Sequence, residues 1–479
     1  MIRLFAIKTL RQVFLEAKLV AAAALVVILF GVGSLLAVGQ HREAQRAYAA
    51  DVERTLAESN LDRLLLVRPP HPLDFVAGTF SGPSKLLGVG PSGIQEVATD
   101  DFKGSFLSIA QQLDWLHVIA VLLSLLAIFV SYDAVSGERE NGTLRLILAQ
   151  PVGRSSFLIG SSFGLLCVLL LPLLLGIAIG LLVLELSPGY ELGLPQLAAV
   201  GAIVFLGALY LAFFVFLSVL ISSLCRHSAT ALIWLILFWL VLVVILPSNG
   251  GVLASLVAPP PQYRDETEKV AQIERNYEPP LIDYYHRMKE VVDGGVDEHV
   301  IQDRLDQLRD RIVAEQVQRL AEKKRLLLAV HEEFARRRLR HLALARATTI
   351  VSPAVLLKSA VERLLTTGES DYRSFLSQAR DYQRTLAEPI ARGQQRHLKE
   401  AQSKNYWQAM YSGFKMTGVA ERTYIGVKPD SDLIPPFLYR RPGLAGGLAA
   451  ASWTLLALIT ISGLLFLAAL RVFARYDVR

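Results

Sequence analysis

Long apolar stretches alternate with charged segments along the chain, and there are six of them. Each is about as long as, or longer than, the ~20 apolar residues that an α-helix needs to cross the hydrocarbon core of a bilayer. The predicted spans are residues 19–39, 115–132, 157–184, 197–223, 229–246 and 443–470. The pattern therefore predicts an all-α integral membrane protein with six transmembrane helices.

Two long polar segments interrupt the spans. In the first, residues 40–112, the sequence predicts a charged helix over 40–66 that stops at a proline cluster and is followed by a Gly/Ser/Pro-rich loop. In the second, residues 248–441, apolar residues recur at spacings of three, four or seven, which is typical of one packed helical face. These residues are Val313, Val317, Leu320, Leu327 and Phe334. The sequence predicts a large helical domain of antiparallel hairpins here rather than a sheet domain.

Local breaks divide this second insertion. Ser352-Pro353 ends the long charged helix, and residues 354–365 form a shorter, more apolar helix. A further charged helix is predicted over 371–402, and the stretch 430–442 is extended and rich in proline.

The short loops carry an uneven distribution of Lys and Arg, which predicts the orientation in the membrane. Basic residues occur in the segment 1–18, the loop 133–156, the turn Arg226-His227 and the tail 471–479, whereas residues 185–196 contain none. We therefore expect both termini in the cytoplasm and both insertions in the periplasm of a bacterial inner (plasma) membrane. Segment 1–18 mixes basic and apolar residues and predicts an amphipathic helix on the inner membrane surface.

The first span has an alternative interpretation as a signal peptide, because Ala37-Val38-Gly39 is a tolerable cleavage site. Its apolar core is longer than that of a typical signal peptide, which favours a retained anchor. Cleavage would not change the topology of the later spans.

The junction between the second and third spans, SYDAVSGERENGTLRLILAQPVGRSSFLIG, combines unusual length with many charges. Asn141-Gly142 predicts a turn, and Thr143 is placed to cap a short helix over 144–150 that ends before Pro151. Glu138 and Glu140 precede this turn and are placed to meet basic groups of a partner. Leu144, Ile147 and Leu148 share one face of the short helix, which predicts an apolar docking face. The alternative is a solvated loop with ordinary charges at helix ends.

These residues carry a family resemblance. Glu138-Arg139-Glu140, Gly142-Thr143-Leu144, and Pro151-Val152 followed by Arg154 resemble the first cytoplasmic loop of ABC transporter type-2 permeases. In that family the loop carries a coupling helix that fits a cleft in the partner ATPase. The resemblance implies an ATPase-coupling set of Glu138, Arg139, Glu140, Gly142, Thr143, Leu144, Ile147, Leu148, Pro151 and Arg154.

Two further features bear on this resemblance. Family members often continue with Leu-Gly-Lys, whereas Ile159-Gly160-Ser161 stands here, so any role of that lysine is absent. A subgroup of the family carries a large extracytoplasmic insertion between the last two spans, and this chain resembles that subgroup.

The resemblance also implies partners and a direction. They are a cytoplasmic ABC ATPase dimer, a second copy of the permease or a related one, and the bilayer, with export or release of an unidentified substrate. No Gly-rich loop followed by Lys-Ser/Thr occurs in the chain, so ATP is expected only in the partner. We expect no cofactor and no enzymatic activity in this chain.

Two other function classes are alternatives to a transporter. In the first, the complex performs ATP-driven mechanical work on a periplasmic partner, with the helices of 248–441 as transmitter and no transported substrate. In the second, the chain is a membrane scaffold or sensor without an ATPase, which the charged loop disfavours.

Composition and charge narrow the classes further. Hydrophobic residues make up 53% of the chain, as expected for a membrane protein. The net charge of +6 is spread over several segments, and no Lys/Arg block alternates with aromatics, which excludes nucleic acid as a partner. Cys167 and Cys225 lie in or at the end of apolar stretches and imply no disulfide framework.

Candidate metal ligands and polar residues in the spans carry little signal. His331-Glu332-Glu333 lacks a second histidine at position 335 and predicts a solvated helix face, and His71 is a loop histidine among prolines.

Between residues 197 and 246 charges occur only at the turn 226–227, which disfavours an ion-coupled carrier. Ser161, Ser162, Ser218, Ser222 and Ser223 either line a path or close-pack helices, and the second role is favoured.

Overall fold

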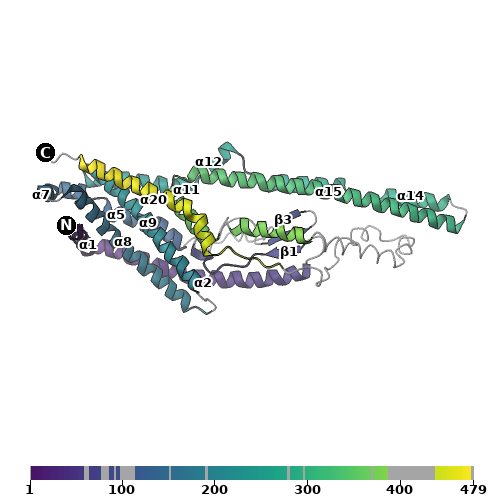
Figure 1. The fold of residues 1–479 in the computed structure, drawn as a ribbon, viewed down its shortest axis with the longest axis horizontal. Helices are drawn as coiled ribbons and strands as arrows, with labels where there is room; N and C mark the ends of the chain where they lie inside the picture. Colours follow the sequence, from purple (N-terminus) through teal and green to yellow (C-terminus); the bar gives the residue numbers. More distant parts are fainter. Residues whose placement is uncertain are drawn as a thin grey trace.

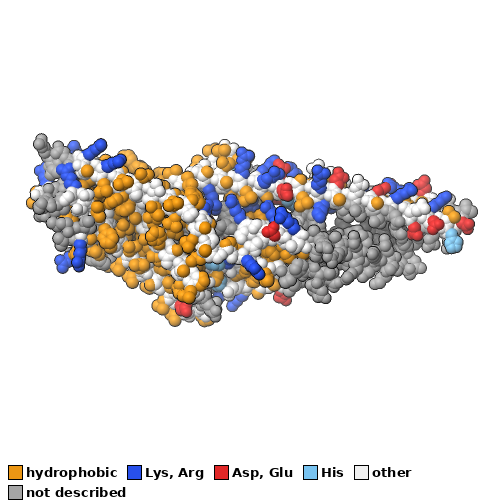
Figure 2. All heavy atoms as spheres, in the orientation of Figure 1, with side chains coloured by type: hydrophobic (Ala, Val, Ile, Leu, Met, Phe, Trp, Pro, Cys, Tyr) orange, Lys and Arg blue, Asp and Glu red, His pale blue; other side chains and the backbone are white. Residues whose placement is uncertain are grey.

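The computed structural model describes residues 2–58, 64–76, 86–90, 93–97, 114–149, 153–188, 193–277, 281–294, 297–367, 371–386 and 437–475. A bundle of apolar helices forms one end of the molecule, and a long helical hairpin extends from its other end (Figure 1). Hydrophobic side chains cover the visible face of the bundle, whereas charged side chains gather along the hairpin (Figure 2).

Six helices are long and apolar enough to cross a membrane, which confirms the predicted all-α class with six spans. They cover Leu19–Glu53, Trp115–Glu140, Arg154–Glu185, Leu194–Leu224, Ser228–Ser248 and Leu444–Ala474. The first belongs to α2 (Ala17–Glu58), which follows the N-terminal helix α1 (Ile2–Leu15). The third, fourth and sixth are single helices, α8 (Arg154–Glu185), α9 (Leu194–Leu224) and α20 (Leu444–Ala474).

The second and fifth spans are composite. Up to Ser131 the second consists of α4 (Trp115–His117), the π-helical η2 (Val118–Leu123) and α5 (Ser124–Ser131). The fifth consists of α10 (Ser228–Trp239), the π-helical η3 (Leu240–Ile245) and α11 (Leu246–Ser248). The sequence contained no signal for these π-helical stretches.

Close packing joins the first three spans around Trp115, which is fully buried. Its indole N–H donates to Ser34 Oγ at 2.9 Å, and Ser34 donates to the Phe30 carbonyl at 2.9 Å. A Cβ at Gly180 of α8 would lie 2.5 Å from the Trp115 ring, so only glycine allows this approach. The buried polar contact and the glycine together set the spacing of α2, α4 and α8.

The large insertion forms the predicted antiparallel hairpin. One arm of the hairpin consists of the helices α12 (Gly250–Val257), α13 (Tyr263–Asn276) and α14 (Leu281–Asp293). The other arm is the single helix α15 (Glu298–Thr349). α15 contains 52 residues, which corresponds to about 78 Å. His331 lies 2.8 Å from Glu266 of α13 with its side chain 12% exposed, so the expectation of a solvated face is wrong at this residue. It is buried because α13 packs against α15 there.

A small antiparallel sheet corrects the prediction for the first insertion. Its strands are β1 (Leu64–Val67), β2 (Leu86–Gly90) and β3 (Gly93–Val97), in the order β1-β2-β3. The helix predicted over 40–66 is wrong at its end, because α2 stops at Glu58 and Leu64–Val67 is a strand. β2 likewise falls in a stretch predicted to be loop.

The sheet exists because it covers a helix of the second insertion. One core combines strand residues with residues of the helix over 371–386 and of the segment 437–439: Leu64, Leu66, Leu87, Val89, Tyr372, Phe375, Ala379, Leu386, Phe437 and Tyr439. β1 also contacts α2, and β3 contacts α15. We call the sheet, the helix over 371–386 and residues 437–441 the insertion unit. The two insertions therefore share one core, to which the first contributes the sheet and the second contributes the helix over 371–386 and the segment 437–439.

The short helix α16 (Pro353–Leu364) belongs to the bundle rather than to the insertion unit. Ser352 Oγ caps it by accepting from Val355 N at 3.3 Å, as the Ser352-Pro353 break predicted. The same hydroxyl donates to the Leu242 carbonyl of the fifth span at 2.5 Å. Leu357 and Val361 are fully buried in the core of the bundle. Its apolar composition is therefore explained by contact with α9 and α20.

Candidate functional site: the charged loop

The charged loop, residues 133–156, lies at the end of the bundle opposite the hairpin. Figure 1 places its helix α7 beside the N-terminal helix α1 and the C-terminal end of α20. The loop contains α6 (Ser136–Glu140) and α7 (Thr143–Ala149), separated by a turn at Asn141-Gly142. Gly142 has φ +71°, a left-handed conformation that favours glycine, so the predicted turn is confirmed.

The beginning of α6 is held by the fourth span. The backbone N–H groups of Val135 and Ser136 donate to Ser222 Oγ at 3.1 and 2.9 Å. Both Ser136 and Ser222 are fully buried. Ser222 therefore joins two elements, which is the close-packing role expected for it.

Arg139 caps the end of α9. Its Nη1 donates to the Cys225 carbonyl at 2.8 Å, and its Nη2 donates to the Ser223 carbonyl at 3.3 Å. The last carbonyls of a helix have no partner inside the helix and carry partial negative charge. The Arg139 guanidinium donates hydrogen bonds to these carbonyls, and its positive charge offsets their partial negative charge.

Glu140 binds the beginning of the next helix, α10. Its carboxylate accepts from Ser228 N at 3.1 Å and from Ser228 Oγ at 2.6 Å. His227 Nδ1 lies 3.3 Å from the same carboxylate. The first N–H groups of a helix are unsatisfied donors with partial positive charge. Arg139 and Glu140 therefore hold the turn between α9 and α10 from both sides.

Glu138 connects the loop to the N-terminal helix. Its carboxylate lies 2.7 Å from Lys8 Nζ, and the Glu138 side chain is 16% exposed. Thr143 Oγ1 donates to the Glu138 carbonyl at 3.1 Å and also to its carboxylate. α1 itself packs directly on α8, because a Cβ at Gly164 would lie 2.9 Å from the Ala6 carbonyl oxygen.

Arg154 closes the loop against the last span. Its Nη1 donates to the Ala474 carbonyl at the end of α20, at 2.7 Å. One turn further, Phe157 stacks on Phe473 with ring centroids 5.7 Å apart. The loop thus contacts the middle of α1 and the ends of α9, α10 and α20, which come from distant parts of the sequence.

The outward face of α7 differs from the predicted one. Leu144 is 2% exposed and Ile147 packs against the bundle core, so the expectation that they form an exposed docking face is wrong. The apolar side of the helix turns inward because the bundle is there to bury it. Arg145 and Leu146 point outward, and Leu146 is 69% exposed.

Some predicted residues are not tested by this geometry. Pro151 and the side chain of Leu148 lie outside the described residues. Glu138 and Glu140 were expected to meet a partner, but the structure gives them Lys8 and Ser228. Sequence reasoning missed the pairings of Lys8 and Ser228 with the loop, and no local spacing signals them.

Metal chemistry finds no support in the part of the chain that the structure describes. Within those residues no group of three or more His, Cys, Asp or Glu side chains is arranged to hold a metal ion. His71 Nδ1 accepts from Leu73 N at 3.1 Å, so one ring nitrogen is used within its own loop.

Comparison with known proteins adds the family. The profile of the ABC-2 family transporter proteins matches residues 91–478. A probable ABC transporter permease protein NosY from Pseudomonas aeruginosa is 34% identical over 146 residues, which cover 29% of this chain and 53% of that protein. A probable NosY permease from Stutzerimonas stutzeri is 40% identical over 74 residues, or 15% of this chain and 27% of that protein. The chain thus spans about half the length of the first of these relatives and about a quarter of the second. With most of its residues matched, the chain belongs to the ABC-2 transporter family and is a multi-pass membrane permease of that type.

Proposed function

We propose that this chain is the permease subunit of an ABC transporter, powered by a separate ATPase that binds at the charged loop. The observation that supports this most is the set of contacts from the loop to α1 and to the ends of α9, α10 and α20. A displacement of the loop therefore reaches several helices at once. Family membership supports an ATPase as the source of that displacement.

The orientation follows from charge. The loop end of the bundle carries exposed arginines, among them Arg3, Arg11, Arg145 and Arg226. Cytoplasmic loops are enriched in such residues, so this end and both termini face the cytoplasm of the inner membrane. The hairpin and the insertion unit then face the periplasm.

The contacts of Arg139 and Glu140 support a coupling mechanism. Two permease copies, identical or related, face each other over two ATPase chains, and closure of the ATPases pushes on the two α7 helices. Arg139 and Glu140 transmit this movement to the turn between α9 and α10, because both side chains bind backbone groups there. The helices then separate toward the periplasm and release a substrate in that direction.

The docking residues of α7 are Arg145 and Leu146 in this proposal, with Leu144 as the internal anchor of the helix. Leu146 is a large apolar side chain, 69% exposed, at the loop end of the bundle. Apolar anchors that enter a desolvated pocket dominate the energy of many interfaces. Arg145 beside it adds a charge at the rim, where single pairs contribute only about 0–1 kcal/mol.

The test is co-purification of the ATPase with full-length permease variants. Leu146→Asp is expected to weaken binding by about 2 kcal/mol or more, which is roughly 30-fold. Leu144→Asp would instead place a charge in the bundle core and lower the yield of folded protein. Leu186→Asp is the matched control, because Leu186 is 75% exposed at the opposite end of α8. Wild-type recovery of the ATPase with Leu146→Asp would refute the docking assignment.

A second candidate function is ATP-driven mechanical work on a periplasmic partner without a transported substrate. The observation that favours it is α15, a helix of 52 residues that runs from the bundle along the whole hairpin. Structure determination of the ATPase-bound complex with trapped nucleotide separates the two functions. A continuous cavity between the permease copies supports transport, whereas a sealed interface with a displaced hairpin supports mechanical work.

A further inference from the structure

α20 runs without interruption from one end of the bundle to the other (Figure 1). Its 31 residues correspond to about 46 Å. The second and fifth spans each contain a π-helical stretch, and α8 contains Pro172. Such features disturb the hydrogen-bond ladder and allow a helix to bend. Residues 444–474 contain neither and form one continuous α-helix, so α20 lacks these two causes of bending.

The loop end of α20 is attached to the charged loop. Arg154 donates to the Ala474 carbonyl at 2.7 Å, and the Phe157 ring stacks on Phe473, which is 1% exposed. Arg154 and Phe157 belong to the first turn of α8, directly after α7. A displacement of α7 therefore reaches the end of α20 through one short segment.

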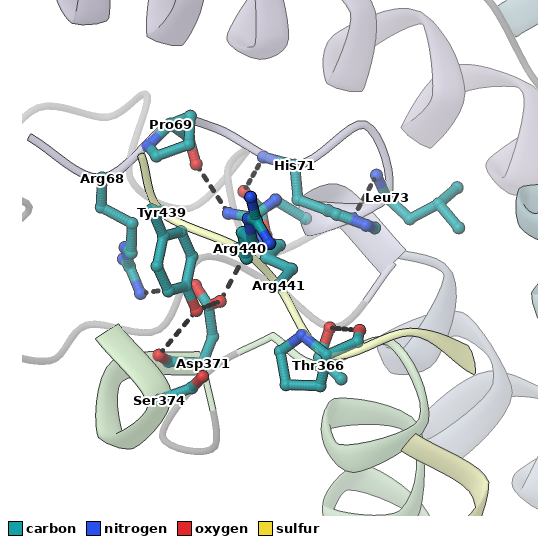
Figure 3. A network of polar contacts seen from close by, with 12 residues as sticks. Arg68, Pro69, His71, Leu73, Thr366, Asp371, Ser374, Tyr439, Arg440 and Arg441 are labelled. Carbon is teal, nitrogen blue, oxygen red and sulfur yellow. Dashed lines mark hydrogen bonds and ion pairs between the residues drawn. The ribbon is translucent and has the colours of Figure 1, made fainter. Parts of the chain in front are cut away.

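The other end of α20 is attached to the insertion unit through Arg441, three residues before Leu444. Arg441 Nε lies 3.1 Å from the Asp371 carboxylate, and its Nη2 donates to the Pro69 carbonyl at 2.6 Å (Figure 3). Tyr439 Oη donates to the same carboxylate at 2.5 Å. Burial, together with Asp371, raises the pKa of the Tyr439 hydroxyl, so it remains a donor.

The backbone around Arg441 is held as well. Arg440 N donates to Gln378 Oε1 at 3.0 Å, and Gln378 Nε2 donates to the Arg440 carbonyl at 2.7 Å. This pair of bonds resembles one step of a β-ladder and ties the segment to the helix over 371–386. Arg440 and Arg441 together leave the connection to α20 little freedom.

The two long sides of α20 have different surroundings. On one side it packs against α9 and α16. On the other, Leu456 and Leu464 are 63% and 61% exposed and face the surroundings of the bundle. A shift of α20 along its axis therefore meets no described part of this chain on that side.

We propose that α20 is an axial strut that passes displacement of the charged loop to the insertion unit, through Arg154 at one end and Arg441 at the other. This inference rests on the proposed function of the charged loop as the ATPase contact. It adds that the insertion unit moves with each ATPase cycle even though it lies at the opposite end of the bundle.

The experiment measures a distance in the full permease–ATPase complex in lipid nanodiscs. Spin labels are placed at Glu185→Cys, at the end of α8, and at Arg380→Cys, on the helix over 371–386, after Cys167 and Cys225 are replaced by alanine. Both labelled positions are exposed. We expect the distance to shift between the nucleotide-free and the vanadate-trapped states.

Three changes interrupt the strut at different points. Arg154→Gln removes the hydrogen bond to the Ala474 carbonyl at the loop end, and Arg441→Gln removes the ion pair with Asp371 at the insertion unit. Insertion of two glycines after Gly443 leaves both attachments intact but interrupts the path between them. Each change is expected to abolish the shift. Arg471→Gln and Arg440→Gln are matched controls, because both side chains are exposed, and they should keep it.

ATPase co-purification and ATP hydrolysis are measured in every sample, which separates the possible failures. If the three variants keep the shift, or if the parent hydrolyses ATP without any shift, the strut is overturned while the proposed function stands. If the parent does not retain the ATPase at all, the proposed function fails and the strut with it.

Discussion

The replacement Asp371→Ala tests the joint that holds the two insertions together. Asp371 is 3% exposed at its side chain and lies 3.0 Å from Arg68 and 3.1 Å from Arg441. Arg68 comes from the first insertion, whereas Asp371 and Arg441 come from the second (Figure 3). Alanine would leave two arginines and the Tyr439 hydroxyl without their shared acceptor.

The expected cost follows from burial. Removing one partner of a buried ion pair typically costs about 3–5 kcal/mol. Arg68 and Arg441 keep 15% and 17% exposure, so water hydrates them in part. We therefore expect the lower end, about 3 kcal/mol, which corresponds to a roughly 100-fold larger opening constant of the insertion unit.

Hydrogen exchange of the full-length protein in nanodiscs measures this constant locally, because slow amides report the free energy of opening. Amides of the helix over 371–386 should exchange roughly 100-fold faster in Asp371→Ala. Asp371→Asn retains an acceptor for Tyr439 but loses the charge, so its effect should be intermediate.

Asp381→Ala is the matched control on the same helix. Asp381 pairs with Arg384 at 3.3 Å, but the two side chains are 71% and 81% exposed. Exposed pairs contribute only about 0–1 kcal/mol, so exchange should change little. Equal exchange rates in Asp371→Ala and Asp381→Ala would contradict the role of Asp371 as the joint.

Further predictions concern other parts of the molecule. Burial, and then Arg441, lower the pKa of His71 to about 4, so the folded state resists protonation more than the unfolded one. The insertion unit should therefore lose stability as the pH falls from about 6.5 to about 4, and His71→Gln should flatten the pH dependence of its exchange rates. Gly447→Leu should reduce the yield of folded protein, because a Cβ there would lie 2.4 Å from the Leu364 carbonyl oxygen; Gly463→Leu, with open space around it, is the control and should not. Arg139→Gln should lower ATPase-driven transport or partner movement without loss of ATPase binding, and unchanged coupling would refute its role at the end of α9.

Short-range features of the fold could be predicted from the sequence. The length of an apolar stretch decides whether a helix crosses a membrane, so the six spans were apparent without any contact. The turn at Asn141-Gly142 and the break at Ser352-Pro353 depend on the conformational preferences of the residues themselves. These features need only a few consecutive residues, and the structure has them where they were predicted.

Strands 64–67 and 86–90 required tertiary information. Leu64-Leu65-Leu66-Val67 is a short apolar stretch, and periodicity alone does not separate a buried strand from a helix at that length. Leu64–Val67 is a strand because it packs against Tyr372 and Phe375, about 300 residues later, and helps to bury their rings. This packing forms only when both insertions meet, so a pattern of neighbouring residues cannot predict it.

The candidate site shows the same division. The sequence alone determined the spans, the charged loop between the second and third of them, and its resemblance to the permease family, because these depend on composition and local order. Only the tertiary structure decided that Arg139 and Glu140 bind the ends of α9 and α10, and that Leu144 faces inward while Leu146 faces outward. A charge or an apolar side chain at a loop has many possible partners. Which partner it takes depends on the free helix ends and buried surfaces that the folded bundle brings within its reach.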